Sequence, residues 1–203
     1  MTSHSAPLRI GILGTGTFAT ALAEAWSRAG HAITVAGRSL AKAQAVGHAA
    51  LSPAELAAAS DVVLLAISYE GLDEALALTG ASLRGKPLID ATNAVDFTTG
   101  RHKAPTGSAA EHVAALTGAH VVKGLNLFAG ESWLTASGTP RTVALCGDDP
   151  AALALTERLI ADLGATPARL GGLDHARQLE DVAGFVMRLV ATGHDPATAV
   201  PSV

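Results

Sequence analysis

The feature that most constrains this chain is a short apolar run that ends in a glycine-rich turn. The run LRIGIL, residues 8–13, is apolar without alternation, as expected of a strand buried on both faces. The pattern G-x-G-x-x-A follows at Gly14, Gly16 and Ala19. A helix-like stretch comes next and stops before Gly30, and a second apolar run, HAITVAG, follows it. This order predicts a β-α-β unit of the size that carries a dinucleotide-binding turn.

Each small residue of this turn is expected to have a separate role. Gly14 makes the tight turn, Gly16 lets the backbone approach a pyrophosphate, and Ala19 lets the helix pack closely on the sheet. The free N–H groups at the helix start then face the phosphate charge. The alternative is an ordinary strand-turn-helix, which a chain rich in alanine and glycine can imitate.

The end of the second apolar run indicates which dinucleotide the site prefers. Sites that prefer NAD usually place Asp or Glu there to hold the ribose 2′-hydroxyl, but residues 34–40 contain no carboxylate. Arg38 can instead pair bidentately with a 2′-phosphate, and Ser39 beside it supplies a hydroxyl. Lys42, one helical turn later, and Thr15, in the glycine turn, can reach the same phosphate. We therefore expect NADP(H) rather than NAD(H). The alternative is that Ser39 caps a helix and Arg38 is merely solvated, and a cap and a phosphate site can also coexist because both use the same free N–H groups.

The composition narrows the class of protein and its partners. The 203 residues are 49% hydrophobic and 16% charged with a net charge of −4, which suits one folded domain without a basic surface for nucleic acid. No apolar run approaches the roughly 18 residues that span a bilayer, so we expect a cytoplasmic protein without a membrane segment. The one cysteine, Cys146, is expected to be a buried, inert thiol, and the scattered histidines form no zinc-binding pair, so no metal is expected.

Apolar and amphipathic segments alternate along most of the chain. Strands are expected within residues 61–67, 86–92, 119–125 and 142–147, and helices within 39–46, 52–60, 70–80, 108–118, 148–164 and 173–191. This alternation predicts an α/β fold with a doubly wound, mainly parallel sheet, the Rossmann NAD(P)-binding fold, as a single domain over residues 1–203 with a C-terminal helix. Residues 93–108 are polar and glycine-rich and are expected to form a mobile active-site loop, and residues 195–203 a flexible tail.

Ligands of open α/β sheets bind beyond the carboxyl ends of the strands, so the segments after each predicted strand supply the candidate site residues. Those expected to hold the dinucleotide are Gly14, Thr15, Gly16, Thr17, Phe18, Gly37, Arg38, Ser39, Lys42, Ala66, Ile67, Ser68 and Asn93. Those expected to line a pocket for a small-molecule acceptor are Tyr69, Asn126, Leu127 and Phe128. Asn126 and Asp90 are the candidates for a catalytic role. Alternatively, Asp90 and Asn93 make an Asx turn and Phe128 belongs to the core.

The predicted site offers no obvious proton donor. The only tyrosine is Tyr69, and Asp73 stands where a short-chain carbonyl reductase would need a lysine. No Ser-His-Asp or Cys-His arrangement is evident either. A reaction that moves only a hydride between two bound rings does not need a proton donor, because holding the rings in contact supplies most of the rate.

The whole chain resembles the coenzyme F-420-dependent NADP oxidoreductase family, whose members pass hydride between NADP(H) and a deazaflavin. The matching stretches are IGILGTGTFATALA, TVAGRSLAKA, SDVVLLAISYEG, VVKGLN, VALCGDDPAALALTERLIADLG and ARQLEDVAGFVMRL. The resemblance implies contacts to the 2′-phosphate from Thr15, Arg38 and Lys42. It also implies that Ile67 and Ser68 lie further along the cofactor, and that IDATNAV and GLNLFAG line the pocket for coenzyme F-420 as co-substrate.

The chain departs from this family at three positions that bear on the site. Members often carry serine at the position of Gly37, proline at that of Ser68 and histidine in the segment of Asn126. Two alternatives therefore stay open from the sequence. One is an NADPH-dependent reductase of another small acceptor, such as an imine, a ketone or a flavin, and the other is a non-catalytic NADP(H)-binding sensor or scaffold.

The expected C-terminal helix is apolar over more than one face. The residues expected to face the core, at spacings of three and four, are Leu179, Val182, Ala183, Val186 and Val190. Those that fall towards the other side are Phe185, Met187 and Leu189. A helix of this kind usually has a second partner, so we expect a C2 homodimer with this helix at the interface and near the acceptor pocket. The alternative is a helix packed wholly inside its own subunit.

Overall fold

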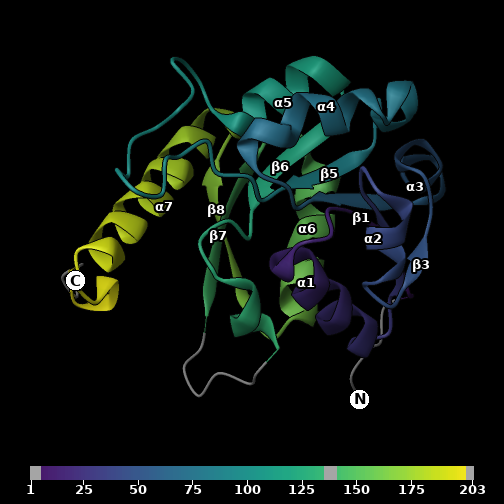
Figure 1. The fold of residues 1–203 in the computed structure, drawn as a ribbon, viewed down its shortest axis with the longest axis horizontal. Helices are drawn as coiled ribbons and strands as arrows, with labels where there is room; N and C mark the ends of the chain where they lie inside the picture. The colour runs from purple at the N-terminus through teal and green to yellow at the C-terminus, as the bar shows by residue number, and fades with distance from the viewer. Residues whose placement is uncertain (1–5, 135–140, 200–203) are drawn as a thin grey trace.

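Eight strands form one sheet in the order β3-β2-β1-β4-β5-β6-β7-β8 in the computed structural model, which describes residues 6–134 and 141–199 (Figure 1). The strands are β1 Arg9–Leu13, β2 Ala32–Ala36, β3 Ala49–Ala50, β4 Val62–Leu65, β5 Pro87–Asp90, β6 His120–Gly124, β7 Thr142–Gly147 and β8 Thr166–Gly171. The α-helices are α1 Thr17–Arg28, α2 Leu40–Gln44, α3 Pro53–Ala59, α4 Leu72–Ala77, α5 Ala109–Thr117, α6 Pro150–Asp162 and α7 Ala176–Ala191. Short 3-10 helices are η1 Tyr69–Gly71, η2 Gly80–Leu83, η3 Gly130–Trp133, η4 Leu173–His175 and η5 Pro196–Thr198.

The strands from β3 to β6 run parallel, whereas β7 runs antiparallel to β6 and parallel to β8. The predicted α/β fold with a doubly wound, mainly parallel sheet is therefore confirmed. The sequence does not predict β3, which has only two residues, or β8, whose segment TPARLG reads as a loop. β8 can form because it lies at the sheet edge, where proline and charged side chains are tolerated.

Helices cover both faces of the sheet, which explains why its central strands are apolar without alternation. On one face, Leu64 of β4 belongs to the same core cluster as Trp26 of α1 and Ile160 of α6. On the other face, the neighbouring Leu65 belongs to a cluster that takes in residues of α3, α4, α5 and α7. Figure 1 shows α1 and α6 on one side of the sheet and α4 and α5 on the other. This packing leaves the ends of the parallel strands as the place where a ligand can approach.

Two predicted helix starts and the predicted inert thiol are confirmed. Ser52 makes a capping box with Glu55 at the start of α3, and Asp149 caps α6 by accepting a hydrogen bond from the N–H of Ala152 at 2.7 Å. Cys146 in β7 is buried, and burial raises the pKa of its thiol to about 12. A thiol in that state is protonated and unreactive near neutral pH.

The inward face of α7 differs from the predicted stripe. Leu179 and Ala183 are buried as expected, but Val182 and Val190 are 38% and 53% exposed, so their assignment to the core is wrong. The other residues of α7 that turn inward are Ala176, Glu180 and Gly184. The expected stripe fails because α7 packs on a polar segment, residues 93–108, as well as on the sheet. Figure 1 shows the C-terminal half of α7 running past the sheet edge.

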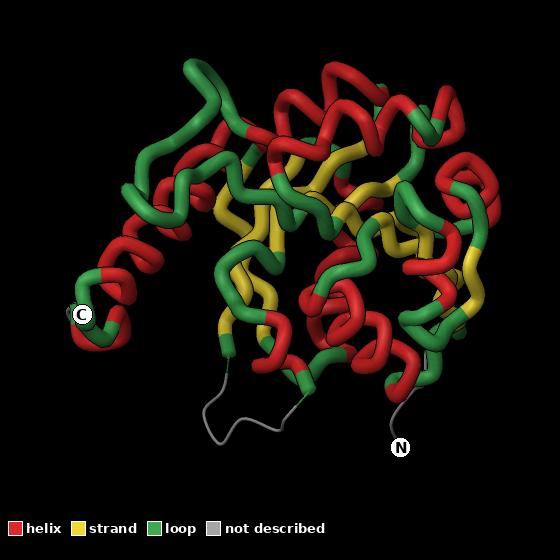
Figure 2. The backbone as a smooth tube through the Cα atoms, in the orientation of Figure 1, coloured by secondary structure: helices red, strands yellow, loops and turns green. Residues whose placement is uncertain are grey.

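Residues 93–108, the loop expected to be mobile, fold back as a hairpin beside α7 (Figure 2). Val95 and His102 form an antiparallel bridge, and at the tip a Cβ on Gly184 would lie 2.5 Å from the carbonyl oxygen of Gly100. The structure shows contacts of this loop, which say nothing about its mobility, and residues 200–203 of the tail lie outside the described residues. The mobility of the loop and of the tail therefore stays a prediction. Among the described residues, no helix is long and apolar enough to cross a membrane.

Candidate functional site

The two glycines of the turn after β1 are needed for different reasons. Gly14 has a φ of 144°, and a Cβ there would lie 2.2 Å from the carbonyl oxygen of Ala66. The backbone therefore requires glycine at this position. Gly16 has an ordinary φ of −83°, and a Cβ there would meet nothing within 4 Å. Glycine at this second position serves to keep space free at the start of α1.

The start of α1 has the properties of an anion-binding site. Gly16 is its N-cap residue, so no side-chain hydrogen bond caps the helix, and its first turn contains no acidic residue. The first N–H groups of this 12-residue helix are therefore free to bind an anion, and the helix dipole favours negative charge there. Open space at Gly16 together with these N–H groups fits a pyrophosphate.

A cavity of about 230 Å³ lies between this turn, the end of β2 and helix α4. Eight of the expected dinucleotide-binding residues line it: Gly14, Thr15, Gly16, Gly37, Arg38, Ala66, Ile67 and Ser68. Leu13 and Ala36, the last residues of β1 and β2, also line it. The sequence does not point to the four remaining lining residues, which come from the start of α3 and from α4 and the turns that flank it: Pro53, Gly71, Ala75 and Leu78. These residues approach the cavity only through the packing of α3 and α4 on the sheet, so no local motif indicates them.

Five other residues expected at the dinucleotide do not line this cavity; Phe18 and Asn93 line the second cavity described below, and Thr17, Ser39 and Lys42 line neither. Thr17 opens α1, and Lys42 is exposed on α2. The Ser39 hydroxyl accepts a hydrogen bond from the N–H of Lys42 at 3.4 Å and so acts as the N-cap of α2. The helix-cap alternative for Ser39 therefore describes the structure, and of the expected cations only Arg38 lines the cavity.

Arg38 faces a carboxylate across the first cavity. Its Nη1 donates to Oε2 of Glu74 on α4 at 2.8 Å, with the two side chains 66% and 61% exposed. A pair this exposed contributes little stability, so the guanidinium can turn to a phosphate at small cost. Gly37 beside it makes room for Thr15, since a Cβ on Gly37 would lie 3.0 Å from Cγ2 of Thr15.

A second cavity of about 500 Å³ adjoins the first at Ala66, Ile67 and Ser68. The residues expected at the site that line it besides these three are Phe18, Tyr69, Asn93, Asn126 and Phe128. Further lining residues come from the loop after β5 and from the segments after β4 and β6: Glu70, Ala91, Val95, Phe97, Lys103, Leu125, Ala129 and Gly130. The polar, glycine-rich composition of residues 93–108 predicts a loop over the site, but it does not identify which side chains face the cavity.

Asn93 and Asn126 are hydrogen-bonded to each other in the wall of the second cavity. Nδ2 of Asn93 donates to the carbonyl oxygen of Asn126 at 2.9 Å, and Nδ2 of Asn126 donates to Oδ1 of Asn93 at 2.9 Å and to the carbonyl oxygen of Leu179 at 3.1 Å. Since both neighbours of Asn126 Nδ2 are acceptors, the orientation of this amide is fixed. Oδ1 of Asn126 is buried and has no hydrogen-bond partner among the described residues. Asn126 lines the second cavity as a residue, and an unpaired buried acceptor in a cavity wall is unusual in native proteins.

The backbone just before Asn126 is strained. Leu125 is the only non-glycine residue with a positive φ among the described residues, at 63°, and it is 1% exposed. A bulky residue in this conformation costs about 1–3 kcal/mol and usually persists where the surrounding structure holds it for a function. Here the strained residue turns the chain at the end of β6 and presents Asn126 to the cavity.

An ion pair between Glu70 and Lys103 lies at the edge of the second cavity. The hydrogen bond from Lys103 lowers the pKa of Glu70, and the same contact raises the pKa of Lys103. Both groups therefore stay charged over a wide pH range and leave the cavity edge nearly neutral.

Asp90, a catalytic candidate from the sequence, does not line either cavity. Its side chain is fully buried, and its Oδ1 accepts the N–H of Thr92 at 2.9 Å in the Asx turn that was the alternative. Its Oδ2 lies 2.9 Å from Nζ of Lys123. Leu127 is also absent from both linings, because it packs against the core instead. Of the two catalytic candidates, Asn126 therefore lies where it can touch a ligand, and Asp90 does not.

Comparison with known proteins gives this arrangement a family context. The sequence family described as NADP oxidoreductase coenzyme F-420-dependent matches residues 9–94. The crystal structure of a proposed F-420-dependent NADP reductase from Arthrobacter sp. FB24 aligns with a TM-score of 0.81 and 30% sequence identity, covering 92% of this chain and 96% of that chain.

Two further relatives are more distant. Metalloreductase STEAP3 from Rattus norvegicus is 29% identical over 188 residues, which are 86% of this chain but span only 36% of that protein. An imine reductase from Aspergillus terreus, solved with NADPH4, aligns with a TM-score of 0.67 and 23% identity, covering 88% of this chain and 60% of that chain. The last similarity shows a shared fold.

Replacing Gly16 with valine tests the pyrophosphate site. We expect Gly16→Val to fold with a melting temperature close to that of the wild type, because the new side chain enters open space. The variant should lose binding of both NADPH and NADH in titration calorimetry, since the side chain occupies the place of the pyrophosphate. Gly14→Val is the matched control and should unfold at a much lower temperature, because its Cβ meets Ala66. Tight NADPH binding by Gly16→Val would contradict the assignment.

Proposed function

The chain belongs to the coenzyme F-420-dependent NADP oxidoreductase family, and from that premise we propose that it transfers hydride between NADPH and a deazaflavin of the F-420 type. The observation that carries this proposal is the meeting of the two cavities at Ala66, Ile67 and Ser68. A dinucleotide held at the glycine turn of the first cavity can direct its nicotinamide into the second. An acceptor ring in the second cavity then lies against it.

The residues of the first cavity supply binding and cofactor preference. Gly16 and the start of α1 fit the pyrophosphate, and Arg38 offers a guanidinium to the 2′-phosphate, with the hydroxyl of Thr15 in the same cavity. Neither cavity has a carboxylate from residues 34–40, where an NAD-preferring site would carry one. This arrangement supports NADP(H).

The residues of the second cavity orient the acceptor. Tyr69 and Phe128 offer flat apolar surfaces, and Asn126 supplies a polar side chain to the same wall of the cavity. When both substrates are bound, the dihydronicotinamide supplies a hydride and the oxidised deazaflavin takes it up together with one proton from solvent. The contribution of the chain is to hold the two rings in contact and to exclude water from between them.

Turnover with purified components tests the proposed reaction. The protein is mixed with NADPH and oxidised F-420, and the absorbance of each is followed; equal molar loss of both is expected. Reduction of an imine, a ketone or a flavin with F-420 left unchanged would assign the site to another small acceptor. Binding of NADPH without turnover of any acceptor would indicate a sensor or scaffold.

Arg38→Ala tests the preference for the phosphorylated dinucleotide. We expect NADPH affinity to fall by about 1.5–3 kcal/mol, the scale of a charge-assisted contact, and NADH affinity to stay nearly the same. Glu74→Gln is the control, because it removes the partner of Arg38 and should not weaken NADPH binding. An equal loss for NADPH and NADH in Arg38→Ala would show that Arg38 has only a structural role.

Asn126→Ala tests the acceptor pocket. The change should leave NADPH affinity intact and reduce turnover or acceptor binding by about tenfold or more, because the acceptor loses the group that orients it. Forward and reverse rates should fall together, since the same side chain serves both directions. Steady-state kinetics in both directions give the measurement, and unchanged constants would place the acceptor elsewhere.

We also propose that a second copy of the chain covers the exposed apolar face of α7. The residues that form this face are Val182, Phe185, Met187 and Val190, which are 38%, 48%, 37% and 53% exposed. Four large apolar side chains on one helix are more than scattered surface exposure explains. The same helix supplies the carbonyl oxygen of Leu179 to Asn126, so a dimer formed here would lie next to the acceptor cavity.

Light scattering on the purified chain tests the dimer. A mass of twice the chain is expected at micromolar concentration, and Phe185→Glu should shift it to the mass of one chain. Leu116→Glu on α5 is the control, because Leu116 is also exposed, at 53%, but lies on another helix. A wild-type chain that is monomeric at micromolar concentration would contradict the dimer.

A further inference from the structure

Behind the second cavity lies a cluster of fully buried charges that neither cavity uses. Lys123 of β6, Asp90 of β5 and Glu180 of α7 are each 0% exposed. Nζ of Lys123 lies 2.9 Å from Oδ2 of Asp90 and 2.8 Å from Oε1 of Glu180, and it also donates to the carbonyl oxygen of Thr92. Taking three charges out of water is costly, so such a cluster contributes little net stability compared with apolar packing.

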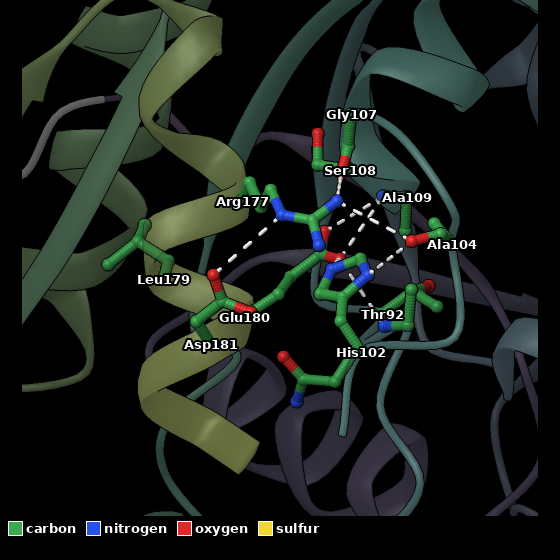
Figure 3. Close-up of polar contacts among 12 residues, drawn as sticks. Thr92, His102, Ala104, Gly107, Ser108, Ala109, Arg177, Leu179, Glu180 and Asp181 are labelled. Atoms are coloured by element: carbon green, nitrogen blue, oxygen red, sulfur yellow. Dashed lines mark hydrogen bonds and ion pairs between the residues drawn. The ribbon is translucent and has the colours of Figure 1, made fainter. Parts of the chain in front are cut away.

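A fourth side chain, His102, joins the cluster from the hairpin of residues 93–108. Nε2 of His102 lies 3.0 Å from Oε2 of Glu180, and its Nδ1 lies 3.1 Å from the carbonyl oxygen of Ala104 (Figure 3). Both ring nitrogens therefore face acceptors, and both contacts are hydrogen bonds only when the ring carries two protons.

The charges hold the peptide groups on both sides of Asn93. Before it, Asp90 accepts the N–H of Thr92 at 2.9 Å and Lys123 donates to the carbonyl oxygen of Thr92. After it, Glu180 accepts the N–H of Ala94 at 3.4 Å. Asn93 thus projects into the second cavity from a backbone that is fixed before and after it by buried charges.

The same cluster fixes the other partner of the asparagine pair. Glu180 follows Leu179, whose carbonyl oxygen accepts Nδ2 of Asn126, and Glu180 also accepts the N–H of Ala109 at 3.0 Å. Figure 3 shows Glu180 reaching from α7 to His102 and Ala109. One carboxylate therefore sets the position of α7 relative to the start of α5 and to the hairpin.

We propose that Lys123, Asp90, Glu180 and His102 are positioning residues for the Asn93–Asn126 pair, which they hold in place in the wall of the second cavity. This inference rests on the proposed function of the second cavity. Its physical reason is directional: apolar packing would bury the same surface, but only charged donors and acceptors fix the orientation of individual peptide groups. The cluster therefore fixes the side-chain amide of Asn126 in the cavity wall, although it contributes little net stability.

A charge-balanced double variant, Lys123→Met/Asp90→Asn, tests the proposal. It removes one cation and one anion together, keeps an oxygen that can accept the N–H of Thr92, and leaves the carbonyl oxygen of Thr92 without its ammonium. We expect kcat to fall about tenfold or more while the NADPH dissociation constant changes less than about twofold, because the first cavity is untouched. When Asn126→Ala is added, the further fall in kcat should be less than about twofold, since both changes disable the same group.

Amide hydrogen exchange gives a readout that needs no acceptor. The N–H groups of Thr92 and Ala94 should exchange about tenfold faster or more in the double variant, while those of α1 stay unchanged. Arg188→Met is the matched control: Arg188 donates to the carbonyl oxygen of Thr98 in the same hairpin at 3.2 Å but does not reach Asn93. This variant should keep kcat and the exchange at Ala94 within about twofold of the wild type.

The inference is overturned if exchange at Thr92 and Ala94 is unchanged, or if the kcat losses of the double variant and Asn126→Ala multiply. If the double variant does not fold, Glu180→Gln tests the same point: exchange at Ala94 and Ala109 should rise, and unchanged exchange overturns the inference. An absence of F-420 turnover in the wild-type chain overturns the proposed function alone, because the exchange measurement decides the positioning role by itself.

Discussion

The ammonium of Lys123 joins parts of the chain that lie far apart in sequence. It meets Asp90 from the neighbouring strand, Glu180 from α7 and the carbonyl oxygen of Thr92 from the loop after β5, and all three charged side chains are fully buried. An unpaired charge in this position would be very costly, so the packing of the strands, the helix and the loop has to bring a partner to each charge. The wall of the larger cavity depends on that requirement.

The glycine turn illustrates how a fold and a ligand can make separate demands on one motif. At Gly14 the backbone passes so close to Ala66 that any side chain would collide with the protein itself. At Gly16 the protein leaves open space, and the uncapped start of α1 faces it. The fold requires the first glycine of the motif, and the second leaves space in which a ligand can bind. The pattern alone is therefore a weak sign of binding, whereas the pattern in this structural setting is a strong one.

Helix α7 combines two environments that are rarely found on one helix. Its inner side carries Glu180 into the charge cluster and Gly184 against the hairpin, where no side chain fits. Its outer side exposes Phe185 and Val190. The inner contacts fix the hairpin at one wall of the acceptor cavity, and the outer face offers an apolar surface beside it.

Much of the fold and half of the site could be predicted from the sequence, because the signals are local. Unbroken apolar runs predict strands buried on both faces, serine and aspartate predict helix starts, and two glycines with an arginine at the expected spacing predict the first cavity. Each of these depends on contacts within about thirty residues. The second cavity was indicated only as a loop and a few strand ends.

The tertiary structure decided which side chains meet across long separations in sequence. Asp90 looked catalytic beside a strand end, yet the structure pairs it with Lys123, 33 residues away, and keeps it out of both cavities. The stripe on α7 looked like core packing, yet Val190 is exposed and Glu180 is buried. A lysine inside the apolar run HVVKG was the one sign of a buried partner. The sequence by itself determined six of the eight strands and the seven α-helices of the described residues, together with the glycine turn, since neighbouring residues decide these. The burial and pairing of charges depend on where distant segments pack, and only the tertiary structure determines that.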